Sequence, residues 1–158
     1  MTTFPSKNEY LKLCQKGNLI PIYQEVLADL DTPVSTYFKI AQKADYSFLL
    51  ESVEGEEKVA RFSFLARDPR LLIEAKEGTV TVRHLHGKPK VDTFKDAGSP
   101  LPIIRSIMKQ YRFVEIPGLP RFCGGLVGYI GYDTIRYFEH LPNKPKDDTG
   151  LPETVLIL

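Results

Sequence analysis

The chain has 158 residues, of which 42% are hydrophobic and 26% charged, a composition typical of a folded globular domain and not of a disordered segment. Its 21 basic and 20 acidic residues nearly cancel, so the net charge favours neither nucleic acid nor an anionic membrane as a partner. Because no apolar run approaches about eighteen residues and no basic, apolar leader follows Met1, we expect a cytoplasmic protein. Two distant cysteines, Cys14 and Cys123, predict free thiols in a reducing compartment.

Helix signals occur at two places along the chain. Asp31 or Thr32 can cap a helix that begins with Pro33, and apolar residues then follow at helical spacing, which predicts a helix over 33–43. A second amphipathic helix is predicted over 101–112, where the apolar positions are Ile103, Ile104, Ile107, Met108 and Tyr111.

Most of the remaining ordered segments are predicted to be strands. Alternating or short apolar runs bounded by turn residues indicate strands at 46–50, 59–65, 71–75, 79–84, 122–132 and 153–158. Residues 87–100 are rich in glycine and proline and are predicted to be mostly loop, and 133–140 a short helix with Asp133 as its cap. The fold class is therefore α+β: mainly antiparallel strands that form part of a larger sandwich, with flanking helices.

The hairpin predicted over 44–66 carries polar residues at an unusual place. Glu51 and Ser52 directly follow the apolar residues of the first arm, and Arg61 heads the second arm. A carboxylate, a hydroxyl and a guanidinium at the mouth of an apolar strand pair can hold the ammonium and carboxylate of an amino acid, with its side chain on the apolar positions. The alternative is an ordinary hairpin with polar ends.

Two other groups of residues do not make a functional motif. The glycines at 124, 125, 128 and 131 do not match GxGxxG, and no Lys-Ser/Thr follows them, so they indicate bulges or a close approach of another backbone instead of a phosphate site. His84 and His86 share a strand face, but no carboxylate or thiol stands at metal-ligand spacing.

The sequence finishes in Val-Leu-Ile-Leu at residues 155–158, which is typical of a buried strand. Chain termini are usually polar and frayed, so this pattern predicts the front piece of a longer protein. The alternative is a C-terminal strand docked in a sheet.

Three segments together resemble the N-terminal region of component I of anthranilate synthase, a chorismate-utilising enzyme. They are LLES at residues 49–52, RFSF at 61–64 and GGLVGYIGYD at 124–133, in the order and spacing of that family. The helix start at 31–33 also matches, and the resemblance runs from about Ile20 to the last residue.

The resemblance implies an enzyme that converts chorismate and ammonia to anthranilate and pyruvate with Mg²⁺, in tryptophan biosynthesis. A glutamine amidotransferase subunit would supply the ammonia, and L-tryptophan would inhibit as the effector. Chorismate and Mg²⁺ belong to a C-terminal domain whose motifs are absent here, so residues 1–158 should carry no catalytic residue, bind no cofactor and be inactive alone. The LLES segment implies a tryptophan site that uses Leu50, Glu51, Ser52 and, with a weaker match, Arg61.

Two alternatives remain open at this stage. Component I of aminodeoxychorismate synthase shares the architecture and makes a folate precursor from the same substrate. A stand-alone amino-acid-binding module without a catalytic partner is the other.

Overall fold

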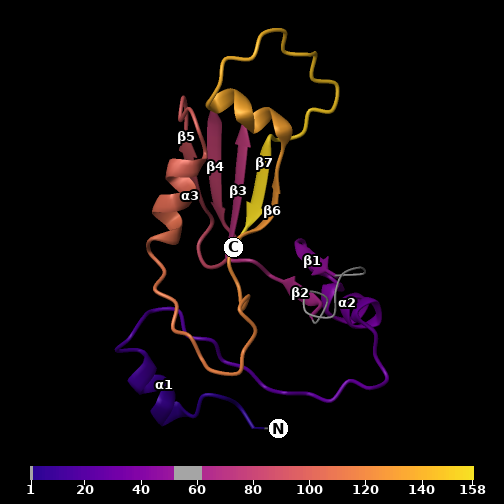
Figure 1. The fold of residues 1–158 in the computed structure, drawn as a ribbon, viewed down its shortest axis with the longest axis vertical. Coiled ribbons are helices and arrows are strands. Elements are labelled where there is room, and N and C mark those ends of the chain that lie inside the picture. Colours follow the sequence, from indigo (N-terminus) through magenta and orange to yellow (C-terminus); the bar gives the residue numbers. More distant parts are fainter. Residues whose placement is uncertain (1, 52–61) are drawn as a thin grey trace.

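The computed structural model describes residues 2–51 and 62–158, which form two antiparallel sheets with short helices around them (Figure 1). One sheet pairs β1 with β2, and the main sheet has the order β5-β4-β3-β7-β6. This arrangement confirms the predicted α+β class. The helices are α1 (Lys7–Leu13), α2 (Pro33–Ala41), α3 (Leu101–Met108) and the 3₁₀ helix η1 (Tyr132–Tyr137), and the strands are β1 (Ser47–Leu50), β2 (Phe64–Arg67), β3 (Leu71–Lys76), β4 (Thr79–His84), β5 (Lys90–Phe94), β6 (Val127–Ile130) and β7 (Thr154–Ile157).

The hydrophobic core lies on the face of the main sheet that α3 covers. Ile73 of β3 is completely buried, and the strand register places Val82 of β4 and Leu156 of β7 directly beside it. Burying a side chain of this size contributes about 1.5–3 kcal/mol, so this cluster is the main source of stability in the sheet. Its buried members are Leu71, Ile73, Ala75, Val80, Val82 and Leu156, and Ile103, Ile104 and Ile107 of α3 pack on them.

Both predicted helices form and begin at the predicted residues, but α2 ends at Ala41 instead of 43 and α3 at Met108 instead of 112. Thr32 is the N-cap of α2: its hydroxyl accepts from the backbone N–H of Ser35, whose side chain in turn accepts from the Thr32 N–H. Pro33 occupies the first helical position, where a missing N–H costs nothing. The other candidate cap, Asp31, instead forms an ion pair with Lys39, in which Lys39 Nζ lies 2.6 Å from Asp31 Oδ1.

The turn between β3 and β4 is held from outside by a carboxylate. Glu77 and Gly78 have φ values of +47° and +76°, the combination that a two-residue hairpin turn requires, and glycine adopts it without strain. The Glu153 carboxylate accepts from the Glu77 N–H at 3.0 Å and from the Tyr137 hydroxyl at 3.2 Å. The Gly78 N–H donates to that same hydroxyl at 3.2 Å, so β7, η1 and the turn are joined at one point.

The strand that contains the glycines differs from its prediction. A buried strand over 122–132 is wrong: β6 covers only Val127–Ile130, lies at the sheet edge and is largely exposed. The reason is tertiary, because β6 has β7 on one side and no strand of the described chain on the other. Gly128 has a φ of +151°, and a Cβ there would collide with the carbonyl oxygen of Val155. This glycine therefore permits a close backbone approach, as the spacing predicted.

Three further local predictions are corrected by the structure. The loop predicted over 87–100 contains β5, which backbone pairing with β4 stabilises. The second arm of the first hairpin was expected at 59–65, but β2 runs from Phe64 to Arg67 and ends where Asp68 takes a φ of +54°. The cap of η1 is Gly131, whose extended backbone suits that position, and Asp133 instead pairs with Arg136 within the first turn.

Residues 2–19, here called the lead-in, contain α1 and dock on the chain after α3. The Asn18 side chain donates to the Gln110 carbonyl at 2.7 Å and accepts from the Arg112 N–H at 2.6 Å. Leu19 forms a parallel bridge with Phe113. These contacts tie the lead-in to a segment more than 90 residues away.

We predict that Gly128→Ala destabilises the chain more than Gly124→Ala does. Both residues have a φ near +150°, so both substitutions impose a similar backbone strain of about 1–3 kcal/mol. Only at Gly128 does the added Cβ meet backbone, and such a collision adds about 1–3 kcal/mol. Urea unfolding of both variants measures the difference, and equal losses would contradict the close approach of β6 to β7.

We also predict that Tyr137 makes stability fall at alkaline pH. Burial raises the pKa of Tyr137 above its usual value of about 10, and the neighbouring Glu153 acts in the same direction, whereas the Gly78 N–H opposes it. The neutral phenol is thus favoured in the folded chain, and its contribution is complete below about pH 10 and lost as the pH rises through the raised pKa.

The measurement is the free energy of unfolding between pH 7 and pH 11. In Tyr137→Phe this part of the alkaline loss should disappear, and stability at neutral pH should fall by about 1 kcal/mol because a hydrogen-bonding hydroxyl is removed. Tyr132→Phe is the control, since that side chain is 83% exposed and should keep the loss. An unchanged pH profile in Tyr137→Phe would refute the assignment.

Candidate functional site

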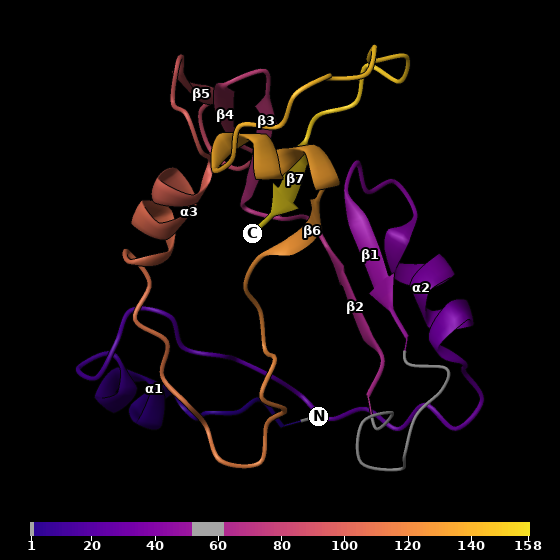
Figure 2. The same cartoon turned by 45° about the horizontal axis from the view of Figure 1, so that its top comes forward.

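The strands β1 and β2 pair in antiparallel register, with Ser47 opposite Arg67 and Leu50 opposite Phe64. One face of this pair rests on α2, as Figure 2 shows. There the Ser47 hydroxyl lies 2.9 Å from that of Tyr37, and the Arg67 guanidinium donates to the Ile40 carbonyl at 2.7 Å. Since α2 covers one face, the other face is available for a different contact.

That other face is apolar and aromatic. Because side chains alternate along a strand, Phe48 and Leu50 of β1 share it with Phe64 and Ala66 of β2, their partners across the ladder. The ring of Phe122, which precedes β6, meets the Phe64 ring edge to face at 5.1 Å. Such an arrangement is favourable for aromatic pairs and holds the start of the glycine-rich segment against the hairpin.

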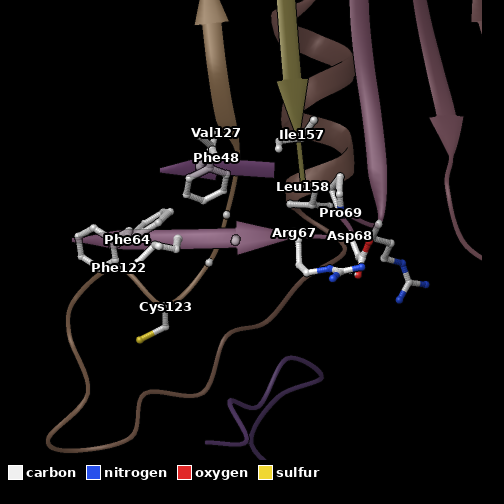
Figure 3. Close-up of a pocket in the computed structure, with 15 residues that line it drawn as sticks. Phe48, Phe64, Arg67, Asp68, Pro69, Phe122, Cys123, Val127, Ile157 and Leu158 are labelled. Atoms are coloured by element: carbon white, nitrogen blue, oxygen red, sulfur yellow. Dashed lines mark hydrogen bonds and ion pairs between the residues drawn. The ribbon is translucent and has the colours of Figure 1, made fainter. Parts of the chain in front are cut away.

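A cavity of about 360 Å³ lies between this face and the edge of the main sheet. Figure 3 shows Phe48 and Phe64 on its hairpin side and Val127, Ile157 and Leu158 toward the main sheet, with Phe122 beside Phe64. At its rim the Arg67 guanidinium pairs with the Asp68 carboxylate at 2.6 Å, so that this arginine is already neutralised. The cavity has the size and lining of a site for an apolar or aromatic group.

The predicted effector residues lie at one end of this hairpin. Leu50 is on the cavity face opposite Phe64 but is 44% exposed and does not line the cavity, and Glu51 follows it directly and is exposed. Ser52 and Arg61 lie outside the described residues, so their predicted roles stay predictions. The structure thus places Leu50 and Glu51 next to the aromatic face and brings neither into the cavity.

The aromatic lining was not anticipated from the sequence. Phe62, Phe64 and Phe122 form a cluster with ring centroids 6.1 Å and 5.1 Å apart, yet Phe122 was interpreted only as the start of a strand. The sequence did contain one signal for this contact, because Phe122 stands two residues before Gly124. Glycines allow another backbone to approach closely, so an aromatic residue beside them can pack on a neighbouring element.

The remaining candidate residues have structural partners. His84 lies 3.1 Å from the Asp92 carboxylate, and His86 lies 3.1 Å from the Asp68 carbonyl. Within residues 2–51 and 62–158, no three potential metal ligands gather at one place. Cys14 and Cys123 are exposed and free, as expected. In the same ranges, the helices are all too short or too polar to span a membrane.

The relatives of this chain described below all carry the same name. No protein-family model matches the chain. Anthranilate synthase component 1 of Acetivibrio thermocellus is 43% identical over 150 residues, covering 95% of this chain and 29% of that protein. The protein of the same name from Synechocystis is 43% identical over 85% of this chain, and that from Neisseria meningitidis serogroup B is 42% identical over 97%.

The matched segments agree with the resemblance seen in LLES, RFSF and GGLVGYIGYD, since the similarity covers nearly the whole chain. The chain spans only 26–31% of the length of these relatives. Over the part that it spans, the chain belongs to the anthranilate synthase component 1 family.

Proposed function

We propose that this chain is the N-terminal regulatory part of an anthranilate synthase component 1, which makes anthranilate and pyruvate from chorismate and ammonia. The observation that carries the proposal is the identity of 42–43% to proteins of that name along 95–97% of the chain. In this proposal the remaining part of the protein binds chorismate and Mg²⁺, a glutamine amidotransferase subunit delivers ammonia, and the complex works in the cytoplasm.

The regulatory role is assigned to the first hairpin. The ammonium of L-tryptophan pairs with the Glu51 carboxylate, its carboxylate with Ser52 and Arg61, and its indole packs on the apolar face that carries Leu50 and Phe64. The support for this assignment is that β1 ends at Leu50, so Glu51 is held at the border between an aromatic surface and solvent. A charged head group and an apolar ring can both be satisfied only at such a border.

In this proposal, inhibition follows from the position of the hairpin face, which is turned toward the main sheet. An effector changes activity only if it binds one arrangement of the protein better than another, typically by 1–3 kcal/mol. A ligand beside the hairpin contacts the surface that faces the main sheet, so its binding depends on how the two sheets are placed. Tryptophan would therefore favour the arrangement that holds the chorismate site inactive.

Aminodeoxychorismate synthase component I remains the second candidate, and the names of the matched relatives favour anthranilate synthase over it. The product formed from chorismate and ammonia by the full-length protein decides between them. Anthranilate and pyruvate support the proposal, whereas aminodeoxychorismate without pyruvate contradicts it. A protein that binds tryptophan without consuming chorismate would be a stand-alone amino-acid-binding module.

We predict that Ser52→Phe weakens tryptophan inhibition of the full-length enzyme without abolishing turnover. The phenyl ring would occupy the space of the effector and remove a hydroxyl, and an unpaired polar group left behind costs about 1–3 kcal/mol. The expected result is at least a tenfold rise in the tryptophan concentration that halves activity, which corresponds to about 1.4 kcal/mol.

Anthranilate fluorescence measures this inhibition at fixed chorismate. Thr93→Phe on the exposed edge strand β5 adds the same ring away from the hairpin and should leave the inhibition curve unchanged. An inhibition curve of Ser52→Phe that overlays the native one would exclude this residue from the effector site.

A further inference from the structure

The face of the main sheet that α3 covers becomes charged at its β5 edge. Residues opposite one another in the ladder point to the same side, so Asp92 beside Val82 and Lys90 beside His84 both lie on the covered face. The apolar Val91 points to the other side and is 56% exposed. The usual alternation, apolar toward the core and polar toward solvent, is therefore reversed over residues 90–92 of this strand.

A cavity of about 440 Å³ lies at this edge, and it is lined by residues of α3 and of strands β3 to β5. Phe94 lines this cavity and stays 42% exposed although it is on the covered face. The apolar residues that line the cavity are Leu71, Val82, Phe94, Pro102, Ile103 and Ile107.

The charges around the cavity leave one cation unpaired. Lys90 Nζ and His84 Nε2 lie 2.9 Å and 3.1 Å from the same oxygen of Asp92, and these contacts, Lys90 first, hold the pKa of Asp92 below its usual value. Arg70 also lines the cavity, and its guanidinium has no hydrogen bond or ion pair with the described part of the chain. Its backbone N–H donates to the Leu158 carbonyl at 2.6 Å, which fixes the base of the side chain.

The helical wall of the cavity adds hydrogen-bonding groups that are also unused. Ser106 of α3 and Gln110 and Tyr111 just beyond it line the space. Their side chains form no hydrogen bond within residues 2–51 and 62–158. An apolar floor with a few converging polar groups is the usual composition of a small-molecule site, and here the unpaired charge is positive.

We propose that this groove between α3 and β5 binds a small organic carboxylate that carries an apolar ring. The carboxylate pairs with the Arg70 guanidinium, whose planar fork matches two carboxylate oxygens. The ring packs on Phe94 and Ile107, and polar substituents of the ligand bond Ser106 and Tyr111. This site is separate from the proposed effector site of the hairpin and does not depend on it.

Arg70 also borders the hairpin cavity, so the test needs a residue that lines the groove alone. Ser106 meets that need, because Ser106→Leu fills the groove with apolar atoms. Arg105→Gln is the matched control for Arg70→Gln, since it removes the same charge from a residue of α3 that does not line the groove.

The experiment titrates the ¹⁵N-labelled chain with benzoate and follows amide shifts by NMR. We expect saturable shifts around β5 and α3, binding at least tenfold weaker in Arg70→Gln and in Ser106→Leu, and a less than twofold change in Arg105→Gln. Circular dichroism of each variant checks that the fold is retained.

Three results would overturn the proposal. One is the absence of saturable shifts in the native chain up to about 10 mM benzoate, a range that detects dissociation constants of roughly 1 mM. Another is equal binding of inorganic phosphate, which would mean that charge alone is recognised. The third is binding that Arg70→Gln removes but Ser106→Leu leaves intact, because that would place the ligand in the hairpin cavity.

Discussion

The main sheet depends on the pairing of β7 with β3. Leu72 faces Ile157 and Ala75 faces Thr154 across this ladder, and β6 joins the sheet only through β7. Bringing β7 beside β3 closes a long stretch of the chain, which costs conformational entropy. The pairing of these two strands must therefore be supported by the burial of side chains. Thr154 is completely buried with its hydroxyl 3.2 Å from that of Thr134, and Glu153 holds the β3–β4 turn. The same segment therefore completes the core and positions η1.

The hairpin cavity follows from the short connection between the two sheets. Between the end of β2 and the start of β3 there are only three residues, and the chain bends at Asp68, whose φ is positive. So short a link keeps the aromatic face of β1 and β2 near the edge where β6 and β7 pair. The glycines before β6 let Phe122 close one side. Residues of both sheets therefore line one cavity, although only a short link joins the sheets in sequence.

Features fixed by neighbouring residues were predictable from the sequence, and features fixed by distant partners were not. The start of α2 follows from Thr32-Pro33, and the β3–β4 turn from Gly78, because caps and turns are local interactions. The exposure of β6 and the presence of β5 depend on which strand lies alongside, which no local pattern specifies. The motif led to the prediction that Leu50 and Glu51 bind an effector, whereas Phe122 lines the cavity only because of a tertiary contact with Phe64.

The strand β5, which was predicted to be part of a loop, also has an unusual distribution of charged side chains. In KVDTF the charged residues fall where an apolar inner face would be expected, so the pattern indicates loop, yet backbone pairing with β4 makes it a strand. The charges of Lys90 and Asp92 add little to the stability of β5, because the two side chains pair with one another at a partly exposed edge of the sheet. Local rules broken without a gain in stability mark positions that function has shaped. The two cavities therefore differ in lining: charged and polar side chains border the groove at β5, whereas the cavity at the hairpin is lined mainly by apolar and aromatic residues.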